Sequence, residues 1–458
     1  MRAARTIIMK RKVVFLFLSI FLFAGILFAQ SDDDLFGGSD DDFFTDDSIV
    51  EVSDVSAKTD LSKGVIFETG SIKIGGSLSA GITTNTVLYS PENKSLGENI
   101  YNSKLKPDLS AMLSVDARPT DILRIYTKFG FAYPFEDKVV AGVSSSSVVN
   151  WFKLKELFTD FSLKDTAFFR FGIHTVTWGT GYFFSPVSDM INTSSIDPEN
   201  PEKQVDGALN LRTQIVFPNS QNCLWFYVIP STNFTNQTAE SYMRETALAG
   251  KFDLLIGNWE FGLGGYYKYQ SAPKAMLTAT GSLKKLSFYG EFVYSYGSTQ
   301  EWGRNPEWDN KTNIIQATAG ISYYWKEPMI TFAAQYYFNG NTKDIPYNYI
   351  ISGHNVAAML NFGKLFNNKD FTLSIFAMGN FGRVEITDQE MAAYRAYGVT
   401  DETLNAMTGT SLTTTAMFYY SPVKELKVGL GPSLTFKDFK NNPTLSLKLS
   451  ANFGGGQF

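Results

Sequence analysis

The stretch that decides the fold is residues 167–217, which read AFFRFGIHTVTWGTGYFFSPVSDMINTSSIDPENPEKQVDGALNLRTQIVF. A run in which apolar and polar residues alternate lies at each end. The first run has Phe169, Phe171 and Ile173 on one face and Arg170, Gly172 and His174 on the other. The second run has Leu209, Leu211, Ile215 and Phe217 opposite Asn210, Arg212 and Gln214. Alternation with a period of two predicts two strands, each with one apolar and one polar face.

The segment between these two strands, residues 176–206, is too long for a simple turn and is rich in Gly, Pro, Asn, Asp and Ser. Connections of this length within a compact fold are usually functional. The polar faces beside it carry cations, which suits a water-filled lumen, and the apolar faces suit lipid. We therefore expect residues 176–206 to fold into a pore and narrow it.

Composition agrees with a membrane barrel. Of the 458 residues, 15% are aromatic and only 19% are charged, yet the mean hydropathy is -0.10. No long apolar run follows residue 30, which excludes a bundle of transmembrane helices. Barrel strands conceal their apolar residues by alternation, so a near-neutral mean is expected for them.

Further alternating runs follow one another from residue 71 to the end, and their connections alternate in length. Short connections are expected near residues 118–121, 164–166, 218–221, 255–258, 284–285, 326–328, 367–369 and 422–424. Long ones are expected near residues 90–104, 133–147, 177–204, 231–240, 298–310, 339–350 and 380–408, and two of intermediate length near residues 271–273 and 436–443. Short periplasmic turns and long outer loops are typical of outer-membrane barrels. The predicted fold is all-β: a transmembrane antiparallel up-and-down β-barrel of about 16–18 strands, with N- and C-termini in the periplasm.

The N-terminus has the pattern of a secretory signal. Arg2, Arg5, Lys10, Arg11 and Lys12 precede an apolar run from residue 13 to residue 28. We expect a cleaved signal peptide at residues 1–29, with either Met1 or Met9 as its start. An acidic tail at 30–65 and a barrel at 66–458 follow.

The acidic tail holds the net charge of the exported chain. The sequence has 40 basic and 45 acidic residues; five bases lie in the signal, and eleven acids and one base lie in residues 31–60, which leaves 34 of each elsewhere. Such a segment cannot bury enough apolar area to order itself. It is interpreted either as a disordered solvated spacer or as a segment that docks on a basic partner.

Candidate site residues lie on the polar faces and in the long loop. Arg124, Lys128, Arg170, His174 and Arg212 fall on faces turned away from lipid, where cations at a constriction favour anions. Asp189, Asp197 and Glu199 of the loop are expected opposite them. The alternative is that these charges pair with one another and stabilise the loop, since period two fixes the face of a residue but not its height.

Other chemistry finds little support in the sequence. One cysteine, Cys223, and two histidines, His174 and His354, offer no metal cluster, so no metal or cofactor is expected. No catalytic motif surrounds His174, and the neutral barrel region lacks the basic surface that nucleic-acid binding needs. The loop tryptophans Trp302 and Trp308 either pack the loop or stack on sugars, and packing is favoured.

One loop also carries a family resemblance. The residues from Gly172 and His174 through Trp178-Gly179, Phe183-Phe184, Pro186, Asp189, Asn192 and Asp197-Pro198 to Gly207 resemble the signature loop of large porin-like outer-membrane barrels. The resemblance implies a channel-like barrel without naming its cargo. It assigns loop packing to Trp178, Gly179, Pro186, Asn192 and Gly207. The terminal Phe458, after an alternating run, resembles the signal read by the barrel-assembly machinery.

Taken together, the sequence predicts no enzyme. It predicts a channel in the outer membrane of a diderm bacterium for diffusion of small hydrophilic solutes, with anion preference as the sharper hypothesis. The expected partners are the lipid bilayer, periplasmic chaperones and the barrel-assembly machinery; a homo-oligomer is left open and no nucleic acid is expected. The alternatives are a binding barrel or adhesin acting through its long outer loops, and a transporter of hydrophobic ligands.

Overall fold

The computed structural model describes residues 67–69, 71–91, 95–133, 138–140, 143–145, 152–164, 166–218, 220–232, 238–341, 352–381, 392, 395, 410–423, 425–437 and 443–457. All of them belong to one compact unit, Glu51–Phe458. The expected signal peptide and acidic tail lie outside the described residues.

The described residues form mainly strands, as the alternating runs predict. The strands are β1 (Phe67–Thr69), β2 (Ile72–Tyr89), β3 (Leu105–Thr120), β4 (Leu123–Tyr133), β5 (Lys138–Val140), β6 (Val143–Ser145), β7 (Phe152–Leu163), β8 (Ala167–His174), β9 (Ala208–Val216), β10 (Cys223–Ile229), β11 (Ala247–Ile256), β12 (Trp259–Lys268), β13 (Lys274–Leu283), β14 (Leu286–Tyr296), β15 (Asn313–Trp325), β16 (Ile330–Asn339), β17 (Gly353–Phe362), β18 (Phe371–Asn380), β19 (Ser411–Val423), β20 (Leu426–Lys437) and β21 (Thr444–Gln457). The short helices are α2 (Leu96–Tyr101), α3 (Ala239–Glu245), α4 (Thr299–Arg304) and the 3-10 turn η2 (Ser188–Met190). None of the described helices is long and apolar enough to cross a membrane.

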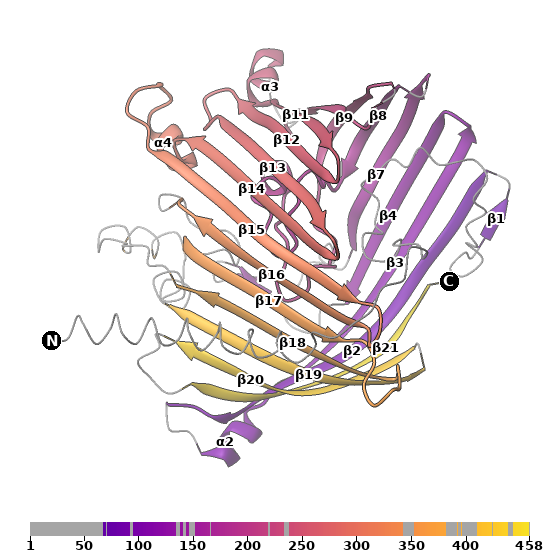
Figure 1. Cartoon of the computed structure of the whole chain (residues 1–458), viewed down its shortest axis with the longest axis vertical. Helices are drawn as coiled ribbons and strands as arrows, with labels where there is room; N and C mark the ends of the chain where they lie inside the picture. Colours follow the sequence, from indigo (N-terminus) through magenta and orange to yellow (C-terminus); the bar gives the residue numbers. More distant parts are fainter. Residues whose placement is uncertain are drawn as a thin grey trace. The chain divides into compact units, whose positions relative to one another are not determined.

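Eighteen strands close into an antiparallel barrel. Each of β2, β3, β4 and β7–β21 pairs with its neighbour in the chain, β4 pairing with β7, and β21 pairs back with β2. The closing register runs from Ser77 opposite Gln457 to Tyr89 opposite Leu445. In Figure 1 the indigo strand β2 accordingly lies beside the yellow β21. Of the two expected strand numbers, eighteen is confirmed and sixteen is wrong.

Two short pieces lie outside the ring of eighteen. β1 pairs with residues Ile72–Ile74 of β2, the part of that edge that β21 does not reach. β5 and β6 form a separate hairpin within the connection between β4 and β7.

The connections alternate in length as predicted. Eight short ones span residues 121–122, 164–166, 217–222, 257–258, 284–285, 326–329, 363–370 and 424–425. Seven longer ones span residues 90–104, 134–151, 175–207, 230–246, 297–312, 340–352 and 381–410. The two intermediate ones span residues 269–273 and 438–443 and are no longer than the turns at 217–222 and 363–370. One end of the barrel therefore carries the short turns, and the other end carries the long loops.

The two faces of each strand differ as the alternation predicts. Outward-facing apolar side chains are exposed, among them Phe171 (51%), Leu263 (61%) and Leu449 (41%). Inward-facing neighbours such as Arg170 and Gln335 are buried. The barrel thus turns apolar groups to its surroundings, whereas its inward faces mix polar side chains such as these with apolar ones such as Met276 and Val293.

Candidate functional site

A row of charged side chains crosses five neighbouring strands at one height of the inner wall. Arg124 of β4 lies opposite Asp160 of β7, Asp160 opposite Arg170 of β8, and Arg170 opposite Arg212 of β9. Asp116 of β3 adjoins the row beside Arg124. The register therefore brings together three of the predicted cations, which the sequence placed only on a common face.

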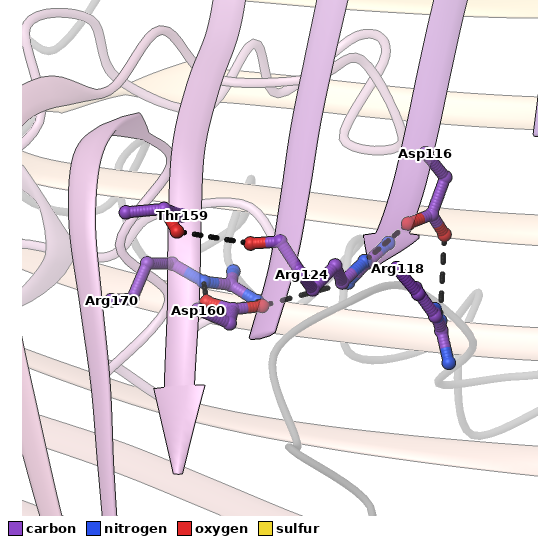
Figure 2. Close-up of polar contacts among 6 residues, drawn as sticks. All are labelled: Asp116, Arg118, Arg124, Thr159, Asp160 and Arg170. Carbon is purple, nitrogen blue, oxygen red and sulfur yellow. Dashed lines mark hydrogen bonds and ion pairs between the residues drawn. The ribbon is translucent and has the colours of Figure 1, made fainter. Parts of the chain in front are cut away.

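Ion pairs join most of this row (Figure 2). Arg170 binds Asp160 through two hydrogen bonds, Nε to Oδ1 at 2.6 Å and Nη2 to Oδ2 at 2.9 Å. Arg124 donates from Nε to Asp116 Oδ1 at 2.9 Å, and its Nη1 lies 3.7 Å from Asp160 Oδ2. Arg118 reaches Asp116 at 3.4 Å. The acidic partners thus come from neighbouring strands and not from the long loop.

The aromatic ring of Phe158 on β7 packs against the arginines of the row. The Phe158 ring lies 3.9 Å below the Arg170 guanidinium carbon and meets the buried His174 ring edge-on at 5.9 Å. Phe158 is opposite Gly172, whose φ of +142° and close approach to Leu157 leave no room for a side chain. Gly172 therefore lets β8 lie close against β7 beneath this ring.

Arg212 ends the row and differs from the other arginines. It is 6% exposed, its Nε has no hydrogen-bond partner among the described residues, and no ion pair joins it to them. Its guanidinium lies 5.5 Å from the Trp225 ring centroid. Buried charges normally have a direct partner, but Arg212 has no direct ion pair among the described residues, and the Asp160 carboxylate acts on it only from across Arg170.

The segment Thr175–Gly207 has its own internal bonds. Asn192 accepts from the Val176 amide at 2.8 Å and donates to the Val176 carbonyl at 2.7 Å, and Trp178 Nε1 donates to the Val187 carbonyl at 2.8 Å. A side chain at Gly207 would meet the His174 carbonyl oxygen at 1.8 Å, so only glycine allows the segment to close.

The remaining loop-packing candidates lie in the same segment. Gly179 donates from its amide to Ser188 Oγ at 3.1 Å, and Pro186 is buried.

Side chains of distant strands hold this segment. Lys251 Nζ of β11 donates to the Trp178 carbonyl at 2.9 Å. Glu291 of β14 and Gln335 of β16 accept from backbone amides between residues 180 and 187. The sequence did not predict that Glu291 and Gln335 hold the segment. The available signal was a glutamate and a glutamine on the inward faces of otherwise apolar strands.

The acidic residues of the segment occupy different places. Asp189 is half-buried within it, and Asp197 Oδ1 accepts from the Glu199 amide at 3.1 Å. Glu199 lies 3.9 Å from Lys448 Nζ of β21. Among the predicted cations, Lys128 lies opposite Glu156 of β7.

Asp206, at the end of the segment, binds two lysines of β7. Its carboxylate accepts from Lys153 and, at 2.8 Å, from Lys155. Burial alone would raise the pKa of Asp206, but these two hydrogen bonds and the lysine charges outweigh it and lower the pKa. The Asp206 carboxylate therefore binds the C-terminal end of the segment to β7.

The two loop tryptophans differ in exposure. Trp302 is buried and donates to the Tyr296 carbonyl at 2.7 Å, whereas Trp308 is 56% exposed and stacks on the Tyr296 ring. Within the described ranges, no group of three or more His, Cys, Asp or Glu is placed to hold a metal ion.

Comparison with known proteins gives likeness to solved structures only. No family model and no curated protein matches the chain. A BenF-like porin from Pseudomonas fluorescens Pf-5 has 8% identity and a TM-score of 0.48, over 83% of this chain and 98% of that one. Pseudomonas aeruginosa OccK9 (OpdG) has 8% identity and a TM-score of 0.47, over 84% and 98%. Pseudomonas aeruginosa OpdQ has 8% identity and a TM-score of 0.48, over 84% and 97%. Values this low carry no argument about what this chain does.

Proposed function

We propose that this chain is an outer-membrane channel through which small hydrophilic solutes diffuse, with a preference for anions. The observation that carries the proposal is a closed eighteen-strand barrel whose outward faces expose apolar side chains around the ring. Soluble proteins rarely expose so much apolar surface. A closed barrel leaves no unpaired strand edge, which is the condition for crossing lipid with strands.

The polar lumen supports passage of hydrophilic solutes. Inward faces of β21, β2 and β3 present Lys448, Asn452, Thr83, Lys106 and Asp108, all of them partly or fully exposed. Apolar inward faces, which a carrier of hydrophobic ligands would need, are absent from these three strands apart from isolated positions such as Met112.

The anion preference rests on the charged row. The row holds four arginines (Arg118, Arg124, Arg170 and Arg212) and two aspartates (Asp116 and Asp160), a net charge of +2. Arg212 has no acidic partner among the described residues. A low-dielectric wall focuses the field of such a charge into the lumen, where it raises the local concentration of anions.

Location and biogenesis follow from the same proposal. The N-terminal signal would send the chain across the inner membrane. The short turns and both chain ends would face the periplasm, and the long loops would face outward. Periplasmic chaperones and the barrel-assembly machinery would then deliver and insert the barrel, and no enzymatic step is proposed.

Conductance in a planar bilayer tests the proposal. Refolded residues 30–458 should give stable open steps, and the reversal potential under a salt gradient should indicate anion preference. The Arg212→Gln variant should lose part of that preference, whereas Arg244→Gln, on the exposed helix α3, should keep it. Absence of steps from a folded barrel would overturn the channel. Steps without anion preference would overturn only the role of the charged row.

A further inference from the structure

The contacts of Thr175–Gly207 cover one half of the barrel wall. Val176, Trp178, Val187, Met190 and Ile191 pack against inward side chains of β10, β11, β13 and β14, namely Tyr227, Ala249, Met276 and Val293. Phe183 and Phe184 pack against β16, β17 and β18 through Ala333, Tyr337, Ala357 and Phe376. In a ring of eighteen, β18 is nine strands from β9, so the segment reaches the wall opposite its own root.

Glu291 is the first anchor of this arrangement. Its Oε1 accepts from the amides of Thr180 at 2.6 Å and Gly181 at 2.7 Å and from Ser185 Oγ at 2.9 Å. Its Oε2 accepts from the Val187 amide at 2.9 Å. Glu291 is 3% exposed, so one buried carboxylate is satisfied by four donors of the segment. Hydrogen bonds to a charged acceptor are among the strongest in proteins.

Gln335 is the second anchor. Its Oε1 accepts from the amides of Phe183 at 2.7 Å and Phe184 at 3.1 Å, and its Nε2 donates to the Phe184 carbonyl at 2.7 Å. Both phenylalanines are fully buried. Buried backbone N–H and C=O groups need hydrogen-bond partners. The Gln335 side chain supplies them for Phe183 and Phe184, which do not belong to a strand.

The wall at β2 and β3 is not covered in this way. On β2 and β3 the inward-facing Thr83, Asn85, Lys106 and Asp108 are exposed. By contrast Thr278 of β13, beside Glu291, is 3% exposed. The segment approaches β21 at one described ion pair, Glu199 with Lys448 at 3.9 Å, which is long and partly exposed.

From these contacts we infer that Glu291 and Gln335 are positioning residues that hold Thr175–Gly207 as a fixed partition. The partition seals the half of the lumen bounded by β10–β18, and solute crosses only on the other side, past β21, β2 and β3. This inference rests on the proposed channel function and adds to it the route of the solute and the residues that set the route.

Cysteine accessibility tests the route. In a Cys223→Ser background, Thr83→Cys and Thr278→Cys place matched thiols on the two halves of the lumen. A lipid-impermeant, anionic methanethiosulfonate reagent should modify the Thr83→Cys variant and lower its conductance. Modification of the Thr278→Cys variant should be about tenfold slower or more, because it requires local opening of the segment. Equal rates for the two variants would overturn the partition.

Removing an anchor tests the positioning role. Gln335→Ala, alone or with Glu291→Gln, should raise conductance, admit larger solutes and speed modification of the Thr278→Cys variant. The matched control is Gln316→Ala on β15, whose side-chain hydrogen bonds among the described residues go to Tyr337 and Asn339 of the wall and not to the segment. Heat-modifiable gel migration, which reports the intact barrel, should stay unchanged in all variants. Conductance and reactivity equal to the parent in the anchor variants would overturn the role of Glu291 and Gln335.

The two failures are separable. If the parent protein conducts no current, the channel proposal fails, yet modification rates measured by mass spectrometry still decide whether one half of the lumen is sealed.

Discussion

The substitution Asp160→Asn removes the carboxylate that lies between Arg124 and Arg170. An asparagine keeps the shape and one acceptor oxygen but loses the charge, so the bidentate bond to Arg170 and the 3.7 Å contact with Arg124 are both weakened. The net charge of the row rises from +2 to +3. We expect the channel to become more selective for anions and the barrel to become less stable.

Both effects have a calculable size. One unit charge at roughly 7 Å from a permeating ion changes its energy by about 0.6 kcal/mol in water. Screening at about 0.1 M salt reduces this to about 0.3 kcal/mol, which changes the anion-to-cation permeability ratio by about threefold, and at 1 M salt the effect nearly vanishes. Breaking a buried pair costs about 3–5 kcal/mol, and because the Asp160 side chain is 25% exposed we expect the lower end, about 3 kcal/mol.

The assay is the reversal potential of the Asp160→Asn channel at low and at high salt, with urea unfolding measured in parallel. Asp309→Asn, in an exposed loop, removes the same charge away from the row and serves as control. An unchanged permeability ratio at 0.1 M, or a change that persists at 1 M, would refute the assignment of selectivity to this row.

Other expected outcomes concern the loops. Asn192→Ala leaves the buried amide and carbonyl of Val176 without partners, at about 1–3 kcal/mol each, so hydrogen–deuterium exchange of that amide should accelerate by at least about tenfold. Asp206 has a lowered pKa in the fold, so its contribution to stability is present above the unfolded value of about 4 and is lost as pH falls through the folded pKa. The unfolding midpoint of the Asp206→Asn variant should therefore be lower than that of the parent at pH 6, and the two midpoints should converge in strong acid. Trp302→Ala should increase proteolysis of its outer loop, since it empties a buried site and removes the bond to Tyr296, while the barrel remains folded.

Much of the fold was predictable because alternation is a direct consequence of a strand with lipid on one side. The faces of Phe171 and Arg170 follow from period two alone. The number of strands follows from counting the connections. It is uncertain by two because a short connection such as residues 269–273 can be a bend within one strand or a turn between two.

The contacts of the site were less predictable because period two fixes the face and not the height. Arg170 and Arg212 turned out to be direct cross-strand neighbours, and their register depends on turn lengths that a sequence does not reveal. The partner of Arg170 is Asp160, ten residues earlier, whereas loop acids such as Asp189 were expected opposite it. The pairing of β4 with β7 also shifts between Lys128 and Phe129, where β7 contributes one extra residue, Lys155.

The anchors of the long segment have a consequence for the order of assembly. The segment leaves the wall after His174. Its partners Glu291 and Gln335 lie 104 to 152 residues after the segment residues that they bind. Contacts of such separation form only after the intervening strands have been placed. The segment can therefore reach its final bonds to Glu291 and Gln335 only after β14 and β16 have formed, so its docking on these two side chains is a late step of folding.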